Sequence, residues 1–167
     1  MESIPIAPAE IALFLGIALC AALALHDLKH LILPDGLNGA LAVTALSHHL
    51  LSNWAWVSPE EAVLGAALGA GALYGVGAIF GKLRGRTALG LGDVKFIAAA
   101  GLWVGVWQVP ALIAIAAIGT LAGVFALRVG GLLRAGALTE RRIPFGPGLA
   151  TALALLLLKS YGDGLWF

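Results

Sequence analysis

Charged residues are scarce in this sequence. Only 11% of its 167 residues are Asp, Glu, Lys or Arg, and 60% are hydrophobic, whereas soluble proteins carry about a quarter charged residues. The formal net charge is +1, and no acidic tail or basic tract is present, so nothing points to a nucleic-acid partner. We therefore predict a protein whose main solvent is the lipid bilayer.

Cysteine is almost absent as well. The single residue, Cys20, lies inside an apolar run, which excludes an internal disulfide and a CxxC metal knuckle. The first ten residues contain Glu2 and Glu10 but no basic residue, unlike the leading region of a cleaved signal peptide. We expect the first apolar segment to be retained as a membrane span.

The apolar runs predict six membrane helices, because about 20 apolar residues cross the hydrocarbon as a helix. We place them near 8–26, 37–56, 60–81, 94–108, 109–130 and 146–162. The division between the fourth and fifth rests on Pro110, which cannot donate a helical hydrogen bond. The expected fold is an all-α, polytopic helical bundle that forms a single domain over 1–167.

The basic residues predict the orientation of this bundle. Most of them fall in or beside three loops, whereas the acidic residues outside these loops lie towards the opposite side. The basic set is Lys29, Lys82, Arg84, Arg86, Lys95, Arg128, Arg134, Arg141 and Arg142. Since Lys and Arg mark cytoplasmic loops, we expect a multi-pass protein of the inner (cytoplasmic) membrane with both termini outside.

Two aspartates are candidates for chemistry. Asp27 ends the first apolar run and Asp93 opens the fourth, and the predicted topology puts both at the cytoplasmic edge. An ionisable group at membrane depth costs at least ~2.5 kcal/mol and is a functional candidate by default. Paired carboxylates can activate water, one accepting a proton and the other donating one. Alone, however, Asp27 is also consistent with a simple pairing to Lys29.

The two acids are expected to be unequal. At ~4 Å, two carboxylates repel by roughly 4 kcal/mol at an effective dielectric constant of 20, so the pair would share one proton. Asp93 lies at a predicted helix N-terminus, which favours its ionised form, and Asp27 lies near a C-terminus. Our hypothesis makes Asp93 the resting base and Asp27 the resting acid.

Three segments together carry a resemblance to a known family. They are Asp27 to Asp35, with its Pro34-Asp35 pair; Gly90-Leu91-Gly92-Asp93-Val94-Lys95; and Pro144-Phe145-Gly146-Pro147. In this order the chain resembles the type IV prepilin peptidase family. The resemblance implies an aspartyl endopeptidase in which Asp27 and Asp93 activate water. Its substrate would be a prepilin or prepilin-like protein in the bilayer, cut after a glycine at the end of a basic leader.

The resemblance also implies what is not needed. No metal and no cofactor are expected. The chain resembles the short, peptidase-only form of the family, such as those serving tight-adherence (Flp) pili or archaeal flagellins, so we expect no methyltransferase activity. The oligomeric state is left open.

The remaining motif residues have structural alternatives. Gly90 and Gly92 permit unusual dihedral angles and close approach of a substrate strand, but Gly-x-Gly-Asp is also an ordinary loop sequence. At Pro34-Asp35 we expect a loop end, with Asp35 or Asn38 capping the next helix, or a substrate contact. Lys95 either extends to the membrane interface or tunes the two acids.

The last motif, Pro144-Phe145-Gly146-Pro147, predicts a non-helical entry that positions the final helix or lines the substrate site, with room at Gly146. One other class of function uses the same two aspartates, a proton-coupled membrane transporter. A transporter of this kind would pass protons between ionisable groups at successive depths of the bilayer. The predicted spans have almost no ionisable groups near their centres.

Overall fold

The protein is all-helical in the part that the structure describes. The computed structural model describes residues 8–84, 90–129 and 144–162, which form five helices and no strands. The helices are α1 (Pro8–His30), α2 (Asp35–Leu51), α3 (Pro59–Arg84), α4 (Leu91–Val129) and α6 (Gly146–Gly162). This confirms the predicted all-α class.

Three of these helices are long and apolar enough to cross a membrane. They are α1, α4 and the stretch Pro59–Leu83 of α3, whereas α2 and α6 have 17 residues each and are about 25 Å long at 1.5 Å per residue. The chain is therefore a membrane protein. Six spans and external termini stay predictions.

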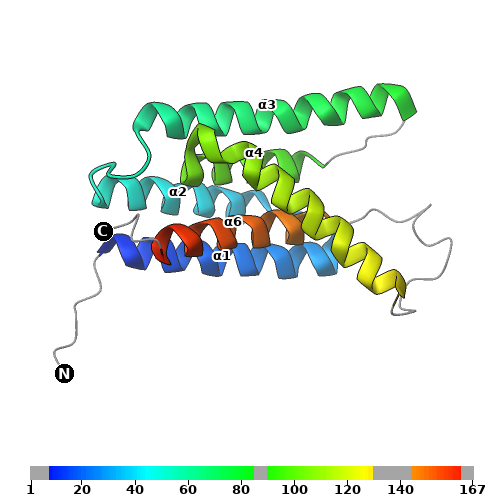
Figure 1. The fold of residues 1–167 in the computed structure, drawn as a ribbon, viewed down its shortest axis with the longest axis horizontal. Helices are drawn as coiled ribbons and strands as arrows, with labels where there is room; N and C mark the ends of the chain where they lie inside the picture. The colour runs from blue at the N-terminus through cyan, green and yellow to red at the C-terminus, as the bar shows by residue number, and fades with distance from the viewer. Residues whose placement is uncertain (1–7, 85–89, 130–143, 163–167) are drawn as a thin grey trace.

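The fourth and fifth predicted helices form one element with a bend. The element runs from Leu91 to Val129, but Gly105 within it has φ 70° and ψ 170°, which is not helical. A non-glycine residue adopts that φ at a steric cost. The predicted division into two helices exists as this bend, but it lies at Gly105 and not at Pro110. Pro110 lies inside the second arm, about one turn after the bend, close to where a fixed φ is tolerated. At Gly105 the chain turns back, so both ends of α4 lie towards the same end of the bundle (Figure 1).

Trp103 anchors the core. Its ring is fully buried, its indole N–H donates to the Leu41 carbonyl over 3.1 Å, and it covers Gly16 of α1. His48 and His49 are also buried beside it. Their rings bond to the carbonyls of Ala9 and Leu102, at 2.9 Å each, so one pair of histidines joins α1, α2 and α4.

Helices α3 and α4 approach backbone to backbone. A Cβ added at Gly65 would lie 2.6 Å from the Gly101 carbonyl oxygen, and Gly69 faces Ile97 and Val109, one from each arm of α4. Glycines let the backbones of membrane helices approach closely. Not every glycine of α3 is used in this way, because Gly71 and Gly75 have no such neighbour within 4 Å.

The helix ends separate into two groups. The last residues of α1 and α3 and the first residues of α2, α4 and α6 lie at one end of the bundle (Figure 1). We call this the motif end, because all three sequence motifs fall there. Lys29, Lys82, Lys95 and Arg128 belong to it, whereas Glu10, Glu60, Glu61 and Lys159 lie towards the other end.

Candidate active site

Asp27 is held by the last helix. It lies within α1, which continues to His30 instead of ending near residue 26, and it is only 5% exposed. The Gly146 backbone N–H donates to its Oδ2 over 3.0 Å. A Cβ at Gly146 would lie 2.6 Å from the same oxygen. The Asp27 carboxylate occupies the room that a side chain at position 146 would need, and a substrate contact at Gly146 stays a prediction.

This contact removes the expected difference between the two acids. Asp27 lies near the C-terminus of its own helix, as predicted, but its carboxylate also meets the first N–H of α6. A helix N-terminus stabilises a negative charge. The reason for expecting Asp27 to be the protonated partner therefore does not hold.

Asp93 lies in the first turn of α4. Its backbone N–H donates to the Gly90 carbonyl over 3.1 Å, and a Cβ at Gly90 would come within 3.3 Å of its Oδ2. Asp93 is partly buried, and the Asp27 carboxylate is close enough to act on it electrostatically. Two acids from helices far apart in the sequence therefore converge at the motif end.

Lys95 pairs with Asp35. Its Nζ donates to Asp35 Oδ2 over 2.7 Å, and the two side chains are 51% and 72% exposed. The two roles expected for Lys95 did not include an ion pair with Asp35. The pair joins the Pro34-Asp35 loop to the beginning of α4, but its exposure means that it contributes at most about 1 kcal/mol.

The start of α2 differs from the prediction. Pro34 is the N-cap residue, and no side chain caps the helix, so capping by Asp35 or Asn38 is wrong. Asp35 instead pairs with Lys95, and the Asn38 amide donates to the Gly92 carbonyl over 3.3 Å. A Cβ at Gly92 would lie 3.0 Å from the Leu33 Cβ. Gly92 is therefore packed against the loop before α2.

The final motif is non-helical only in its first half. Pro144 and Phe145 precede α6, whereas Gly146 and Pro147 already belong to its first turn. Proline fits there because the first N–H groups of a helix need no partner within it. Phe145 packs partly buried against the core, which directs the Gly146 N–H at Asp27.

Asn38 and Leu33 are the residues that sequence reasoning missed at this site. Leu33 looked like one more apolar residue, and Asn38 was assigned to capping. α2 also contains Thr44, His48 and His49, so an amide side chain in this helix did not by itself single out Asn38. The predicted loop cations Arg86, Arg134, Arg141 and Arg142 lie outside the described residues.

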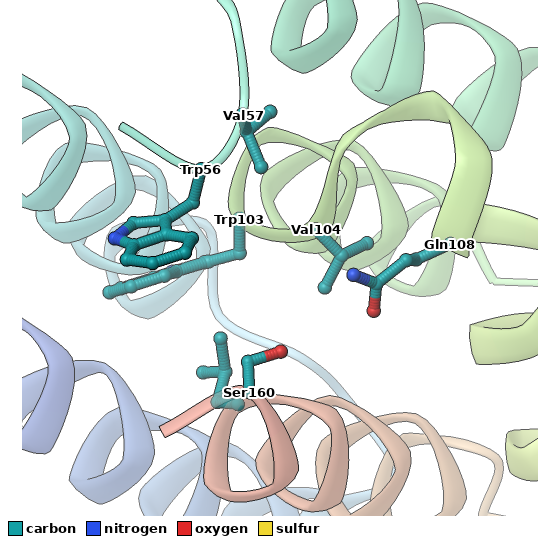
Figure 2. A pocket seen from close by; sticks show the side chains of 7 residues that line it. Trp56, Val57, Trp103, Val104, Gln108 and Ser160 are labelled. Atoms are coloured by element: carbon teal, nitrogen blue, oxygen red, sulfur yellow. The ribbon is translucent and has the colours of Figure 1, made fainter. Parts of the chain in front are cut away.

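A separate cavity lies away from the aspartates. It has a volume of about 160 Å³ and is lined by Trp56, Val57, Trp103, Val104, Gln108, Leu157 and Ser160. Figure 2 shows the tryptophan rings on one side and the Gln108 amide and Ser160 hydroxyl on the other. Ser160 belongs to the end of α6 opposite Gly146, so this cavity is not part of the aspartate site. Within the described ranges, no group of three His, Cys, Asp or Glu side chains is arranged to hold a metal ion.

These features define a class: a helical membrane protein that gathers two aspartates and the glycines beside them at one end of its bundle. The type IV leader peptidase family matches residues 14–127. A prepilin leader peptidase/N-methyltransferase from Aeromonas hydrophila is 36% identical over 148 residues, 87% of this chain and 48% of that protein. The protein of the same name from Dichelobacter nodosus is 35% identical over 131 residues, 78% of this chain and 42% of that protein.

The chain belongs to the type IV leader peptidase family, an aspartic-type peptidase family, and the predicted family is confirmed. A third relative of the same name, from Neisseria gonorrhoeae, is 31% identical over 134 residues, 80% of this chain and 43% of that protein. The chain spans about half the length of the curated relatives it matches. No solved structure matches it.

Proposed function

We propose that this protein is an aspartyl endopeptidase that removes the leader peptide of a prepilin or prepilin-like protein. The observation that carries the proposal is the convergence of Asp27 and Asp93 at the motif end, each with its Oδ2 beside a glycine: a Cβ would lie 2.6 Å from Asp27 Oδ2 at Gly146 and 3.3 Å from Asp93 Oδ2 at Gly90. The relatives named prepilin leader peptidase/N-methyltransferase supply the substrate class. Methyl transfer is not part of the proposal.

The chemistry follows from a pair of carboxylates that shares one proton. The ionised acid takes a proton from water, the water oxygen attacks the scissile carbonyl carbon, and the protonated acid gives its proton to the carbonyl oxygen. When this intermediate collapses, the peptide C–N bond breaks and the proton taken from water passes to the leaving amine nitrogen. We assign the roles of base and acid to the two aspartates as a pair and not to one residue each. The separate assignment of Asp93 as resting base and Asp27 as resting acid loses its support, because both carboxylates lie at helix N-termini.

The motif end would face the cytoplasm. In the described residues it carries Lys29, Lys82, Lys95 and Arg128, whereas three glutamates and Lys159 lie towards the other end. Positively charged ends of membrane helices stay on the cytoplasmic side. A substrate with a basic leader in the cytoplasm and an apolar helix in the bilayer would then present its cleavage site at the depth of the aspartates.

The other residues would shape this site. Gly90 and Gly92 would keep the turn before Asp93 close to its neighbours. Pro34 and Asp35 would form the facing start of α2, with Lys95 as the partner of Asp35. Pro144, Phe145, Gly146 and Pro147 would direct the α6 N-terminus at Asp27. No observation favours the transporter alternative. The charged side chains of the described helices lie near helix ends and not through their middles.

The proposal is tested by expressing the protein with a prepilin in cells that lack their own leader peptidase. Asp27→Asn and Asp93→Asn should each abolish conversion of precursor to mature pilin on a gel, at unchanged membrane levels. Glu60→Gln, an exposed carboxylate in the first turn of α3, is the matched control and should process normally. Normal processing by either aspartate variant contradicts the proposal.

A further inference from the structure

Asn38 is a buried polar residue outside the three motifs singled out in the sequence. It lies in α2, one turn after Asp35, and is 4% exposed. Its Nδ2 donates to the carbonyl oxygen of Gly92, a residue 54 positions away, over 3.3 Å. The Gly92 carbonyl carbon is bonded to the Asp93 nitrogen, so this contact acts on the peptide group that leads into Asp93.

The stability of the fold does not explain an asparagine here. The Oδ1 of Asn38 is buried and has no hydrogen-bond partner among the described residues. A half-satisfied amide in an apolar interior is less favourable than an apolar side chain of similar size. Leucine would fit the surrounding chemistry better, which makes the contact with Gly92 the reason for the amide.

Gly92 is confined from a second side. A Cβ there would lie 3.0 Å from the Leu33 Cβ and 3.2 Å from the Leu33 carbonyl oxygen. The Gly92 peptide therefore lies against the Leu33 backbone and is tied by the Asn38 amide at its carbonyl. These two contacts fix the position of the turn without any bond to the Asp93 side chain itself.

We propose that Asn38 is a positioning residue, which holds the Gly92 carbonyl so that the Asp93 carboxylate faces Asp27. The catalytic consequence of this positioning rests on the proposed peptidase function. The side chain does not touch the reacting atoms. Its hydrogen bond restrains the direction in which α4 begins, and therefore the distance between the two acids.

The kinetic test is Asn38→Leu, which keeps the branched shape of the side chain and removes the donor. The kcat for prepilin cleavage by purified protein should fall at least about tenfold while KM stays within about twofold. The reason is that a small misplacement of a reacting group weakens stabilisation of the transition state more than binding of the substrate. The thermal midpoint in detergent should not fall, because the unpartnered Oδ1 is removed as well. An unchanged kcat overturns the proposal.

The matched control is Thr44→Val. Thr44 is buried in the same helix, but its hydroxyl donates within α2, to Leu41. Thr44→Val should leave kcat unchanged. If Thr44→Val reduces kcat as strongly as Asn38→Leu, the effect comes from disturbing α2 and the proposal is overturned. Asn38→Ala should act like Asn38→Leu on kcat, and it provides a second measurement if the leucine variant is poorly folded.

A measurement without activity separates this inference from the function. In a Cys20→Ala background, Asp27→Cys and Asp93→Cys can be joined by a short bismaleimide, and the cross-linked fraction reports whether the two positions face each other. Adding Asn38→Leu should lower that fraction several-fold, and adding Thr44→Val should not. An equal fraction with Asn38→Leu overturns the positioning role.

The two proposals fail in different ways. If the wild type cleaves no prepilin while cross-linking depends on Asn38, the peptidase function fails and the positioning of Asp93 stands. If Asp27→Asn and Asp93→Asn abolish cleavage while Asn38→Leu changes neither kcat nor cross-linking, the function stands and the role of Asn38 is overturned.

Discussion

The Asp27 carboxylate accepts a hydrogen bond from the Gly146 backbone N–H over 3.0 Å, although 119 positions separate the two residues. This bond links the first helix of the described chain to the first turn of the last one. It brings a buried acid to the positive end of a helix, where its ionised form is stabilised. A change on either side of the bond should therefore alter the acid that the proposed chemistry needs.

Gly146→Ala tests the space around Asp27. The new Cβ would lie 2.6 Å from Asp27 Oδ2, so the carboxylate must move away from the α6 N-terminus. We expect prepilin cleavage to fall about a hundredfold, as for other misplaced reacting groups, in an assay with purified protein. Gly71→Ala, where no neighbour lies within 4 Å, is the control. Full activity of Gly146→Ala would show that Asp27 does not work in this position.

The pH dependence tests whether the two acids act as a pair. If one must be protonated and the other ionised, kcat should fall at low pH, where both are protonated, and at high pH, where both are ionised. The measurement is kcat for prepilin cleavage against pH. The control is the folded state of the same detergent-solubilised protein at each pH, which separates a loss of activity from unfolding. A profile with a single limb would indicate that only one aspartate changes its protonation state.

Lys95 and Asp35 provide a test of the surface contact. Because both side chains are more than half exposed, a double-mutant cycle with Lys95→Gln and Asp35→Asn should give a coupling energy below about 1 kcal/mol in thermal or chemical unfolding. The pH optimum of Lys95→Gln should equal that of the wild type, since the lysine is engaged with Asp35. A shifted optimum would instead make Lys95 a modulator of the two acids.

Gly65→Ala tests the packing between α3 and α4. The added methyl group would lie 2.6 Å from the Gly101 carbonyl oxygen, a backbone atom that cannot rotate away. We expect destabilisation of about 1–3 kcal/mol from overpacking, measured by unfolding in detergent or bicelles. Gly75→Ala, with nothing within 4 Å, should be neutral or slightly stabilising because alanine favours helix. Equal stabilities of the two variants would contradict the close approach.

The helices were predictable because their signal is local. A run of apolar residues long enough for a bilayer requires no knowledge of the partner helices, and each described helix overlaps a predicted one. Their ends were less predictable. The first helix continues to His30 because polar residues are tolerated in an exposed last turn, and the fourth bends at Gly105 because tertiary packing there demands a positive φ.

The site was predictable in its members but not in its contacts. Asp27 and Asp93 stand out as ionisable residues at the ends of apolar runs, and charge placed both on one side. The bonds from Gly146 to Asp27 and from Asn38 to Gly92 join residues 119 and 54 positions apart. Such bonds depend on how helices pack, and no sequence spacing indicates them. An amide that caps its own helix and one that reaches a neighbouring helix look the same in a sequence.

The bond between Asp27 and α6 has a consequence for biosynthesis. A ribosome delivers Asp27 to the membrane early and Gly146 more than a hundred residues later, so the first acid waits without its donor while the intervening helices insert. On the proposed function, the site would be complete only once α6 docks. A nascent or truncated chain that lacks α6 would then lack cleavage activity even with both aspartates present.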